Sequence, residues 1–268
     1  IDKLIILKKR KFSLHWFYLW KQIFFNYWDC IVDLRGTLIS FFLFAKTRKV
    51  YSVRSNLHKV KEISSLFPGR DLSPNIFLNE NNVKNKSFLK LTQKIALNKK
   101  LIIVAPSANW IGKTWPIQNF CSLLKKLYKN TNFKNSYFII VGPKNEKKSI
   151  QGLLKLKDVP ILDLVGKTDL VEIFLIMKKS KIFIGNDSGL MHLSALADIP
   201  TVGLFGPSDS KRYHPWGKKT LAIKSPKSPK ELMGHKDFNP KKVNSLMKDL
   251  TVNYVFKELI KFYKTCYD

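Results

Sequence analysis

Short apolar runs alternate with helix-like segments along most of this chain, and this alternation constrains its fold more than any other feature. Nearly every run ends in Gly, Pro, Asp or Ser. Strands that alternate with helices form parallel sheets covered by helices, and such sheets bind ligands at the carboxyl ends of their strands. The sequence therefore predicts an α/β fold with functional residues in the turns after the strands. The clearest predicted strands are 101–105, 137–141, 161–164, 182–184 and 201–205.

The predicted organisation is two domains with a closing helix. We expect a first domain with its linker at 1–95, a second domain at 96–250 and the helix at 251–268. The stretch 67–85 is rich in Pro, Gly, Asn and Asp, which indicates a surface linker. In the first domain we predict strands at 2–7, 30–34 and 49–53 and helices at 13–28, 37–45 and 58–67. In the second domain we predict a helix whose first residue is Pro116 and a helix at each of 169–180 and 189–197. We predict a loop at 224–240, and the closing helix extends over 251–263.

The predicted helix at 13–28, opened by Ser13, is rich in aromatic residues. Two interpretations stay open for it. A helix of this kind packs its apolar face against a core, or the face touches a membrane or a lipid acceptor.

The chain is strongly basic, with 48 Lys and Arg against 19 Asp and Glu and a formal net charge of +29. Only six of the basic residues are Arg, whereas base recognition favours the Arg fork, so we expect no nucleic-acid partner. The charge fits either solvated Lys faces or attraction to anionic lipid or a phosphorylated acceptor. No apolar run approaches the ~18 residues of a membrane span. Three widely spaced cysteines predict neither a disulfide framework nor a zinc site, which favours a reducing, cytosolic setting.

The strongest candidate site is the segment 181–200, in which a buried strand turns directly into a helix. A helix N-terminus offers unpaired backbone N–H groups and a positive dipole, and it therefore binds anions. Asp187 can cap this helix, while Ser188 and Gly189 let a diphosphate approach closely. His192 lies four residues after Ser188, on the same helical face. The alternative is a capped core helix with a buried histidine.

The loop 106–116 joins a second strand to a second helix start. It supplies the small hydroxyl residue Ser107 and one well-placed cation, Lys113, although its spacing is not that of a P-loop. Two further turns follow strands, at 142–146 and 204–209. Glu146 in the first can accept hydrogen bonds from a ribose, or it is simply exposed.

Taken in order, these turns resemble the lipopolysaccharide heptosyltransferases, glycosyltransferase family 9, which have the GT-B fold of two Rossmann-like domains. The resemblance implies an enzyme that transfers heptose, or a related sugar, from a nucleotide-sugar donor to the lipopolysaccharide lipid A-core. It implies ADP-heptose as the donor, no cofactor, an inverting reaction and a cytoplasmic protein peripheral on the anionic inner face of the membrane. The motifs that carry it are Lys113-Thr114-Trp115-Pro116, Gly166-Lys167-Thr168-Asp169-Leu170, Asn186-Asp187-Ser188-Gly189-Leu190-Met191-His192 and Phe205-Gly206-Pro207-Ser208-Asp209, with 28–36 in the first domain.

The resemblance also implies roles for particular residues. Lys113 and His192 act on the departing diphosphate, Glu146 touches the ribose and Thr168 touches the adenine. Hydrogen-bond donors aimed at a leaving diphosphate stabilise its developing charge. No Asp-x-Asp pair occurs, so we expect a reaction without a metal. The expected donor-binding set is Ser107, Lys113, Glu146, Thr168, Asp187, Ser188, Gly189 and His192.

The family's opening Gly-Asp turn, which carries its general base, is missing from the sequence. Because residue 1 is Ile, we expect a truncated chain with an incomplete first domain and no general base. Asp2, Asp29 and Asp33 have no motif support for that role. The alternatives are another GT-B nucleotide-sugar enzyme, separable by a preference for UDP donors, and a non-catalytic relative that only binds the nucleotide sugar.

Overall fold

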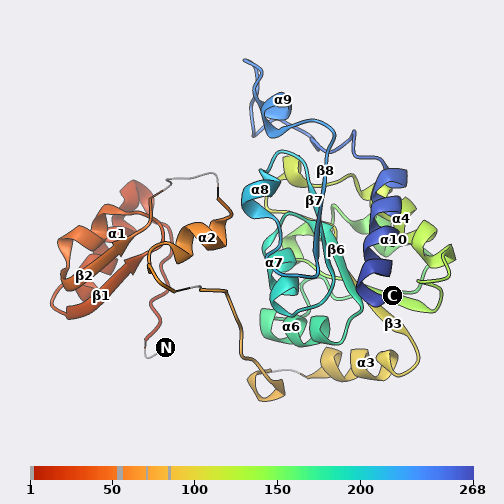
Figure 1. Cartoon of the computed structure of the whole chain (residues 1–268), viewed down its shortest axis with the longest axis horizontal. Coiled ribbons are helices and arrows are strands. Elements are labelled where there is room, and N and C mark those ends of the chain that lie inside the picture. The colour runs from red at the N-terminus through yellow and green to blue at the C-terminus, as the bar shows by residue number, and fades with distance from the viewer. Residues whose placement is uncertain (1–2, 53–56, 71, 84–85) are drawn as a thin grey trace. The chain divides into compact units, whose positions relative to one another are not determined.

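A computed structural model describes residues 3–52, 57–70, 72–83 and 86–268 as two compact units, Ile1–Ser73 and Pro74–Asp268 (Figure 1). The boundary lies earlier than the expected one at residue 95. Helix α3 (Ser87–Ala96) packs against the first strand and a helix of the second unit, so it belongs there rather than to a linker.

The second unit is built on one six-stranded, fully parallel sheet. Its strand order is β5-β4-β3-β6-β7-β8. The chain winds outward from β3 in one direction and from β6 in the other, which is the Rossmann arrangement with its reversal point between these two strands. The predicted parallel α/β sheet is confirmed. The strands are β3 (Lys100–Ala105), β4 (Ser136–Ile140), β5 (Ile161–Asp163), β6 (Ile182–Asn186), β7 (Thr201–Phe205) and β8 (Thr220–Lys224).

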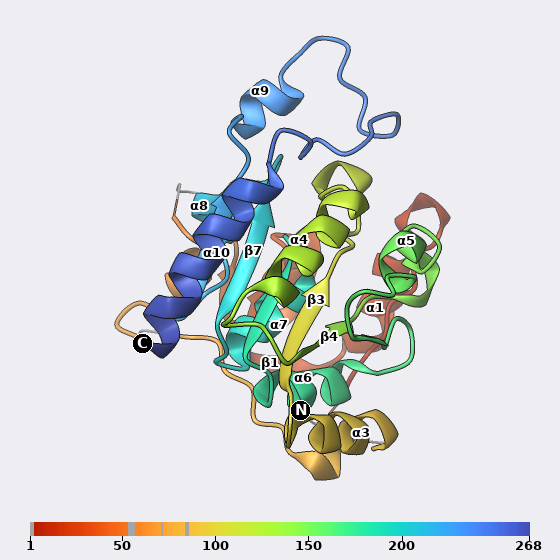
Figure 2. The same ribbon diagram turned by 90° about the vertical axis from the view of Figure 1, so that its right-hand side faces the viewer.

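Helices cover both faces of this sheet, because its strands are apolar on both sides. In β3, Leu101 and Ile103 belong to one buried cluster, whereas Ile102 and Val104 belong to the other. Figures 1 and 2 show α6 and α7 on one side of the central strands and α4 and α10 on the other. The helices after α3 are α4 (Ile117–Lys129), α5 (Gln151–Leu154), α6 (Leu170–Lys178), α7 (Gly189–Leu196), α8 (Ser210–Tyr213), α9 (Pro229–Met233) and α10 (Val252–Tyr267), with 3₁₀ turns η3 (Glu80–Asn82), η4 (Ile111–Lys113) and η5 (Lys144–Glu146).

Several predictions for this unit need correction. The strand β8 and the helix α3 were not predicted, and the loop expected at 224–240 contains α9. Helix α9 forms because Ser228 and Glu231 make a reciprocal capping box. Pro116 is the residue before helix α4 rather than its first residue.

The first unit contains a parallel two-stranded sheet of β1 (Tyr27–Asp33) and β2 (Phe44–Val50). The predicted strand at 30–34 is confirmed as part of β1, and the predicted helix at 58–67 as α2 (Lys59–Ser64). The helix expected at 37–45 is wrong: a 3₁₀ turn, η2 (Leu38–Phe42), leads directly into β2, as aromatic residues favour extended structure. The strand expected at 49–53 overlaps β2 only at Lys49 and Val50, because β2 begins and ends earlier. Residues 51 and 52 lie outside any strand, and residue 53 lies outside the described residues. The strand expected at 2–7 is wrong over 3–7, which the structure describes without helix or strand.

Helix α1 (Leu14–Ile23), which follows the 3₁₀ turn η1 (Lys11–Ser13), is not the core-packed helix of the first interpretation. None of its residues, all of them described, is buried. Ser13 stands at the expected N-cap position, but its side chain does not cap, and its φ of 57° is left-handed. Among its aromatic side chains, Phe17 and Tyr18 are exposed, whereas Trp16 and Trp20 are half-buried.

Candidate functional site

The strongest ion pair of the candidate site lies where the strand order of the sheet reverses. Lys113 ends the 3₁₀ turn η4 after β3, and Asp187 follows β6. The Lys113 Nζ donates to Asp187 Oδ2 at 2.8 Å, and the two side chains are only 30% and 10% exposed. Open α/β sheets bind ligands at this reversal point. The pair places a partly accessible cation there.

Asn186, the last residue of β6, holds this arrangement together. Its Oδ1 accepts from the Trp115 backbone N–H at 3.0 Å, and its Nδ2 donates to the Pro106 carbonyl at 2.8 Å. Trp115 is itself fully buried and donates from Nε1 to the Leu250 carbonyl at 2.8 Å. The loop that carries Lys113 is therefore tied to the end of the neighbouring strand. Asn186 had no predicted role. The one indication in the sequence is that a polar residue ends an apolar strand.

The N-terminus of α7 is open beside this pair. Ser188 occupies the N-cap position, yet its side chain makes no cap, and Asp187 bonds to Lys113 rather than capping the helix as expected. The Ser188 Oγ is buried and has no hydrogen-bond partner among the described residues. A Cβ built on Gly189 would meet no described atom within 4 Å. The first backbone N–H groups of α7 cannot bond within the helix, so they remain available to an anion.

His192 lies one turn into α7 and is half-buried. Burial lowers its pKa, and His214 and Lys113 add to that effect, while Asp187 opposes it; the net shift is downward. His192 is therefore held in its neutral form at pH 7 in the ligand-free protein. His214, just after α8, is a neighbour that the sequence analysis missed, because no local pattern links it to residue 192.

Ser107 and Glu146 line one cavity of about 300 Å³ at the carboxyl ends of β3 and β4. A Cβ built on Gly142 would lie 3.0 Å from the Ser107 Oγ, so glycine lets the two loops approach. Thr114 and Ser245 add further hydroxyl groups to the cavity wall. The lining is mainly apolar, and these few polar groups could orient the hydroxyl groups of a sugar.

Thr168 lies in the loop between β5 and α6, and its Oγ1 is buried without a hydrogen-bond partner in the described part of the chain. The preceding Gly166, at a φ of 68°, packs against Lys144, and its N–H donates to the Gly142 carbonyl at 2.8 Å. These contacts join the β5 turn to the β4 turn. No hydrogen bond in the described structure links Thr168 to the other predicted site residues.

The predicted residues thus fall into four places. Ser107 shares a cavity with Glu146, and the Lys113–Asp187 ion pair lies near the neutral His192. Ser188 precedes α7 and Gly189 begins it, while Thr168 has no hydrogen-bond partner in the described structure.

Of Asp29 and Asp33 in the first unit, only Asp33 has side-chain hydrogen bonds in the described structure. Asp33 accepts hydrogen bonds from the Arg35 N–H and from the Thr37 N–H and hydroxyl, at 2.7–2.9 Å. Burial acts to raise the pKa of Asp33, but these hydrogen bonds together lower it. Its carboxylate is therefore engaged in the turn at Gly36. Asp29 lies within β1, and Asp2 is outside the described residues.

Two further features bear on metals and membranes. Over the ranges that the structure describes, no group of three or more His, Cys, Asp and Glu residues comes together. No helix in the described ranges has both the length and the apolar character needed to cross a membrane.

A fully parallel sheet in this strand order, with an uncapped helix N-terminus at its reversal point, places the second unit in the Rossmann-like α/β class. The chain belongs to glycosyltransferase family 9 (heptosyltransferase), whose profile matches residues 78–242. This confirms the family resemblance read from the motifs.

Known relatives agree with this assignment. Lipooligosaccharide heptosyltransferase 2 of Campylobacter jejuni is 28% identical over 131 residues, which cover 47% of this chain and 39% of that protein. The match thus spans well under two thirds of the relative's length. The crystal structure of the glycosyl transferase family 9 protein from Veillonella parvula has a TM-score of 0.71, with 16% identity, over 99% of this chain and 83% of that one. The structure of the E. coli ADP-heptose lps heptosyltransferase II has a TM-score of 0.68, with 19% identity, over 90% and 78%. These likenesses show the fold and confirm the expected GT-B class.

Proposed function

We propose that this protein transfers heptose, or a related sugar, from a nucleotide-sugar donor to the lipopolysaccharide core. The observation that carries the proposal is the uncapped N-terminus of α7 beside the Lys113–Asp187 pair at the reversal point of the sheet. Membership of family 9 and the name of the similar Campylobacter protein support the sugar and the acceptor. The name of the similar E. coli structure supports ADP-heptose as the donor.

The residues around α7 would hold the donor diphosphate. Lys113 and the first N–H groups of α7 donate to its oxygens, and His192 approaches it from the first turn of the helix. Lys113 bonds to Asp187 in the ligand-free protein. When the donor binds, the Lys113 ammonium therefore interacts with both the Asp187 carboxylate and the phosphate. We assign the ribose to the cavity of Ser107 and Glu146, and the adenine to the turn of Thr168, whose buried Oγ1 is unpartnered in the described structure.

The proposed reaction inverts the anomeric carbon and needs no metal. An acceptor hydroxyl oxygen bonds to that carbon as the bond to the diphosphate breaks, and a general base takes the hydroxyl proton. The donors at α7 stabilise the negative charge that develops on the diphosphate. We do not assign the base to Asp33, since its carboxylate is engaged in its own turn.

We further propose that the protein works in the cytoplasm and touches the inner face of the membrane through α1. A cavity of about 530 Å³ is lined by Trp16, Phe17, Trp20 and Phe42 with few polar atoms. The basic run Lys8–Lys11 precedes α1. Aromatic side chains insert at the headgroup boundary, and nearby cations are attracted to anionic lipid.

Calorimetry and a transfer assay test the proposed reaction. We expect ADP to bind more tightly than UDP. In an assay of transfer to a lipopolysaccharide core, we expect ADP-heptose to be the better donor, with a known heptosyltransferase in a separate reaction as positive control. Tighter binding of UDP would favour another GT-B nucleotide-sugar enzyme. ADP binding without transfer is the result expected of a chain without its general base or of a non-catalytic relative.

Vesicle sedimentation tests the membrane contact. We expect binding to vesicles that contain phosphatidylglycerol but not to pure phosphatidylcholine, and a loss of binding in Phe17→Ser. Leu97→Ser is the matched control, because Leu97 is also exposed but lies in the second unit. Equal loss in both variants would mean that α1 is not the contact surface.

A further inference from the structure

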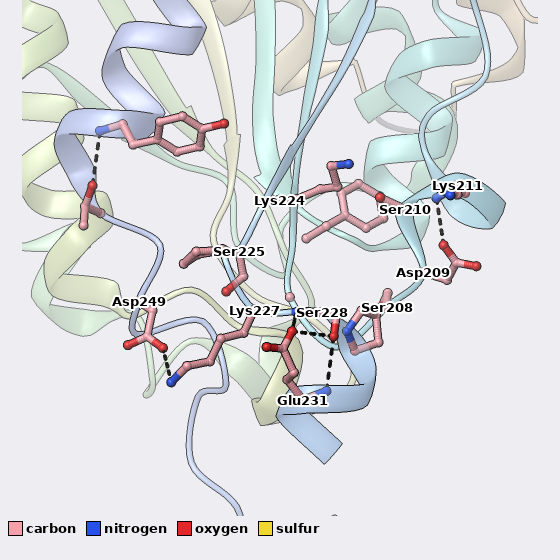
Figure 3. Close-up of a pocket in the computed structure, with 16 residues that line it drawn as sticks. Ser208, Asp209, Ser210, Lys211, Lys224, Ser225, Lys227, Ser228, Glu231 and Asp249 are labelled. Atoms are coloured by element: carbon pink, nitrogen blue, oxygen red, sulfur yellow. Dashed lines mark hydrogen bonds and ion pairs between the residues drawn. The ribbon is translucent and has the colours of Figure 1, made fainter. Parts of the chain in front are cut away.

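A third cavity, of about 700 Å³, lies in the second unit beyond the ends of β7 and β8 (Figure 3). Its walls come from the segment after β7, the end of β8, α9 and the first turn of α10. It includes none of the residues assigned to the donor. A cavity of this size suits a sugar-sized ligand.

The carboxylates of this cavity are already engaged within the protein. Glu231 Oε2 accepts from the Ser228 N–H and hydroxyl at 2.8 and 2.6 Å. Asp249 pairs with Lys227 at 2.7 Å, and Asp209 Oδ1 accepts from the Lys211 N–H at 2.9 Å. Figure 3 shows these contacts as dashed lines around the cavity.

Four donor side chains of the cavity, in contrast, are not engaged by any described residue. The ammonium groups of Lys211 and Lys224 form no ion pair with any described residue. Ser225 is only 8% exposed, and its Oγ has no hydrogen-bond partner in the described structure; the same holds for the Ser208 Oγ. A buried hydroxyl without a partner is costly, and a serine hydroxyl reorients about a single torsion. A ligand in the cavity could satisfy both hydroxyls.

The surroundings favour an anionic ligand with a sugar ring. Residues 205–254 contain 11 Lys and Arg against 4 Asp and Glu, so the local field is positive. Tyr254, in the first turn of α10, lines the cavity and is 48% exposed, so it offers a ring face. Aromatic rings pack against the apolar faces of sugars, while ammonium and hydroxyl groups donate to phosphate or carboxylate oxygens.

We propose that this cavity binds a sugar carrying a phosphate or carboxylate group, separately from the nucleotide-sugar donor. The anionic group lies between Lys224 and Ser225, and the sugar ring packs on Tyr254. The segment 206–214 separates this cavity from the donor site: Ser208 and Ser210 face the cavity, whereas His214 interacts with His192. The proposal does not depend on the identity of the transferred sugar.

Calorimetry with glucose 6-phosphate, in the presence of saturating ADP, tests the proposal. We expect glucose 6-phosphate to bind, and inorganic phosphate and glucose each to bind more weakly than it does. Lys224→Gln should weaken glucose 6-phosphate by about tenfold or more, as expected for a lost hydrogen bond to a charged group. Ser225→Ala should weaken it by a smaller factor. Lys218→Gln is the matched control, because Lys218 is exposed and does not line the cavity.

Each of the other outcomes would overturn one part of the proposed site. Unchanged binding in both Lys224→Gln and Ser225→Ala would remove the ligand from this cavity. Competition by ADP would place glucose 6-phosphate at the donor site. Equal affinity for glucose would refute the anionic group, and equal affinity for inorganic phosphate would refute the sugar ring. The ADP affinity and melting temperature of each variant, expected to be unchanged, separate these results from misfolding and from failure of the proposed donor site.

Discussion

Lys113 is the residue whose side chain contributes most to the proposed donor site. We predict that Lys113→Ala weakens ADP binding by about 1.5–3 kcal/mol, the range for a hydrogen bond to a charged group. Calorimetry measures this directly. Lys129→Ala removes an exposed lysine from α4 and should leave the affinity unchanged. Unchanged affinity in Lys113→Ala would leave that lysine as a structural partner of Asp187 only.

His192 should make ADP binding depend on pH. Burial lowers the pKa of its imidazole in the free protein, and a bound diphosphate stabilises the imidazolium and raises that pKa. ADP affinity is then highest below the free-state pKa, falls as pH rises between the free and bound values, and is constant above them. Calorimetry between pH 5 and 8, corrected for the titration of ADP, measures the profile.

His192→Gln should flatten this profile without a large loss of melting temperature. His235→Gln is the control, since His235 is exposed and outside the site. If His192→Gln instead lowers the melting temperature and keeps the profile, His192 is a structural residue and the anion site consists of α7 and Lys113 alone.

At the scale of elements, Asn186 joins the end of β6 to the loop after β3. We predict that Asn186→Ala lowers the free energy of unfolding by roughly 2–4 kcal/mol, because it leaves the buried Trp115 N–H and Pro106 carbonyl without their partner. Urea unfolding measures the loss. Asn253→Ala removes an exposed hydrogen bond from α10 and should cost less than about 0.5 kcal/mol. Similar losses in both variants would contradict the proposed role.

At the scale of the whole molecule, the second unit contains a complete sheet with both faces covered. We predict that residues 74–268 fold cooperatively without the first unit and bind ADP with the affinity of the whole chain. Urea unfolding and calorimetry check the two statements. A non-cooperative transition would show that the second unit does not fold independently. Loss of ADP binding in a folded second unit would show that the first unit contributes to the nucleotide site.

Local sequence patterns were sufficient to predict many of the helices and strands of the second unit. The strand at 201–205 has the predicted bounds, and α6 and α7 begin within one residue of theirs, because apolar periodicity and turn residues act over a few positions. The same patterns predicted that Lys113 and the turn before α7 lie at one edge of the sheet. The apolar run of β8 has only three residues between Thr220 and Lys224, and the first unit has weaker periodicity, so their elements were missed or misplaced.

The sequence by itself determined the parallel α/β class, the family and the turns that supply the candidate residues. Only the tertiary structure decided that Lys113 bonds to Asp187, 74 residues away, that Asn186 joins the end of β6 to the loop after β3, and that His192 is half-buried near His214. It also decided that α1 is exposed and that unpaired donors gather beyond β7 and β8. Helices and turns depend on neighbours in sequence, whereas strand order, burial and side-chain pairing depend on which distant segments the fold brings together.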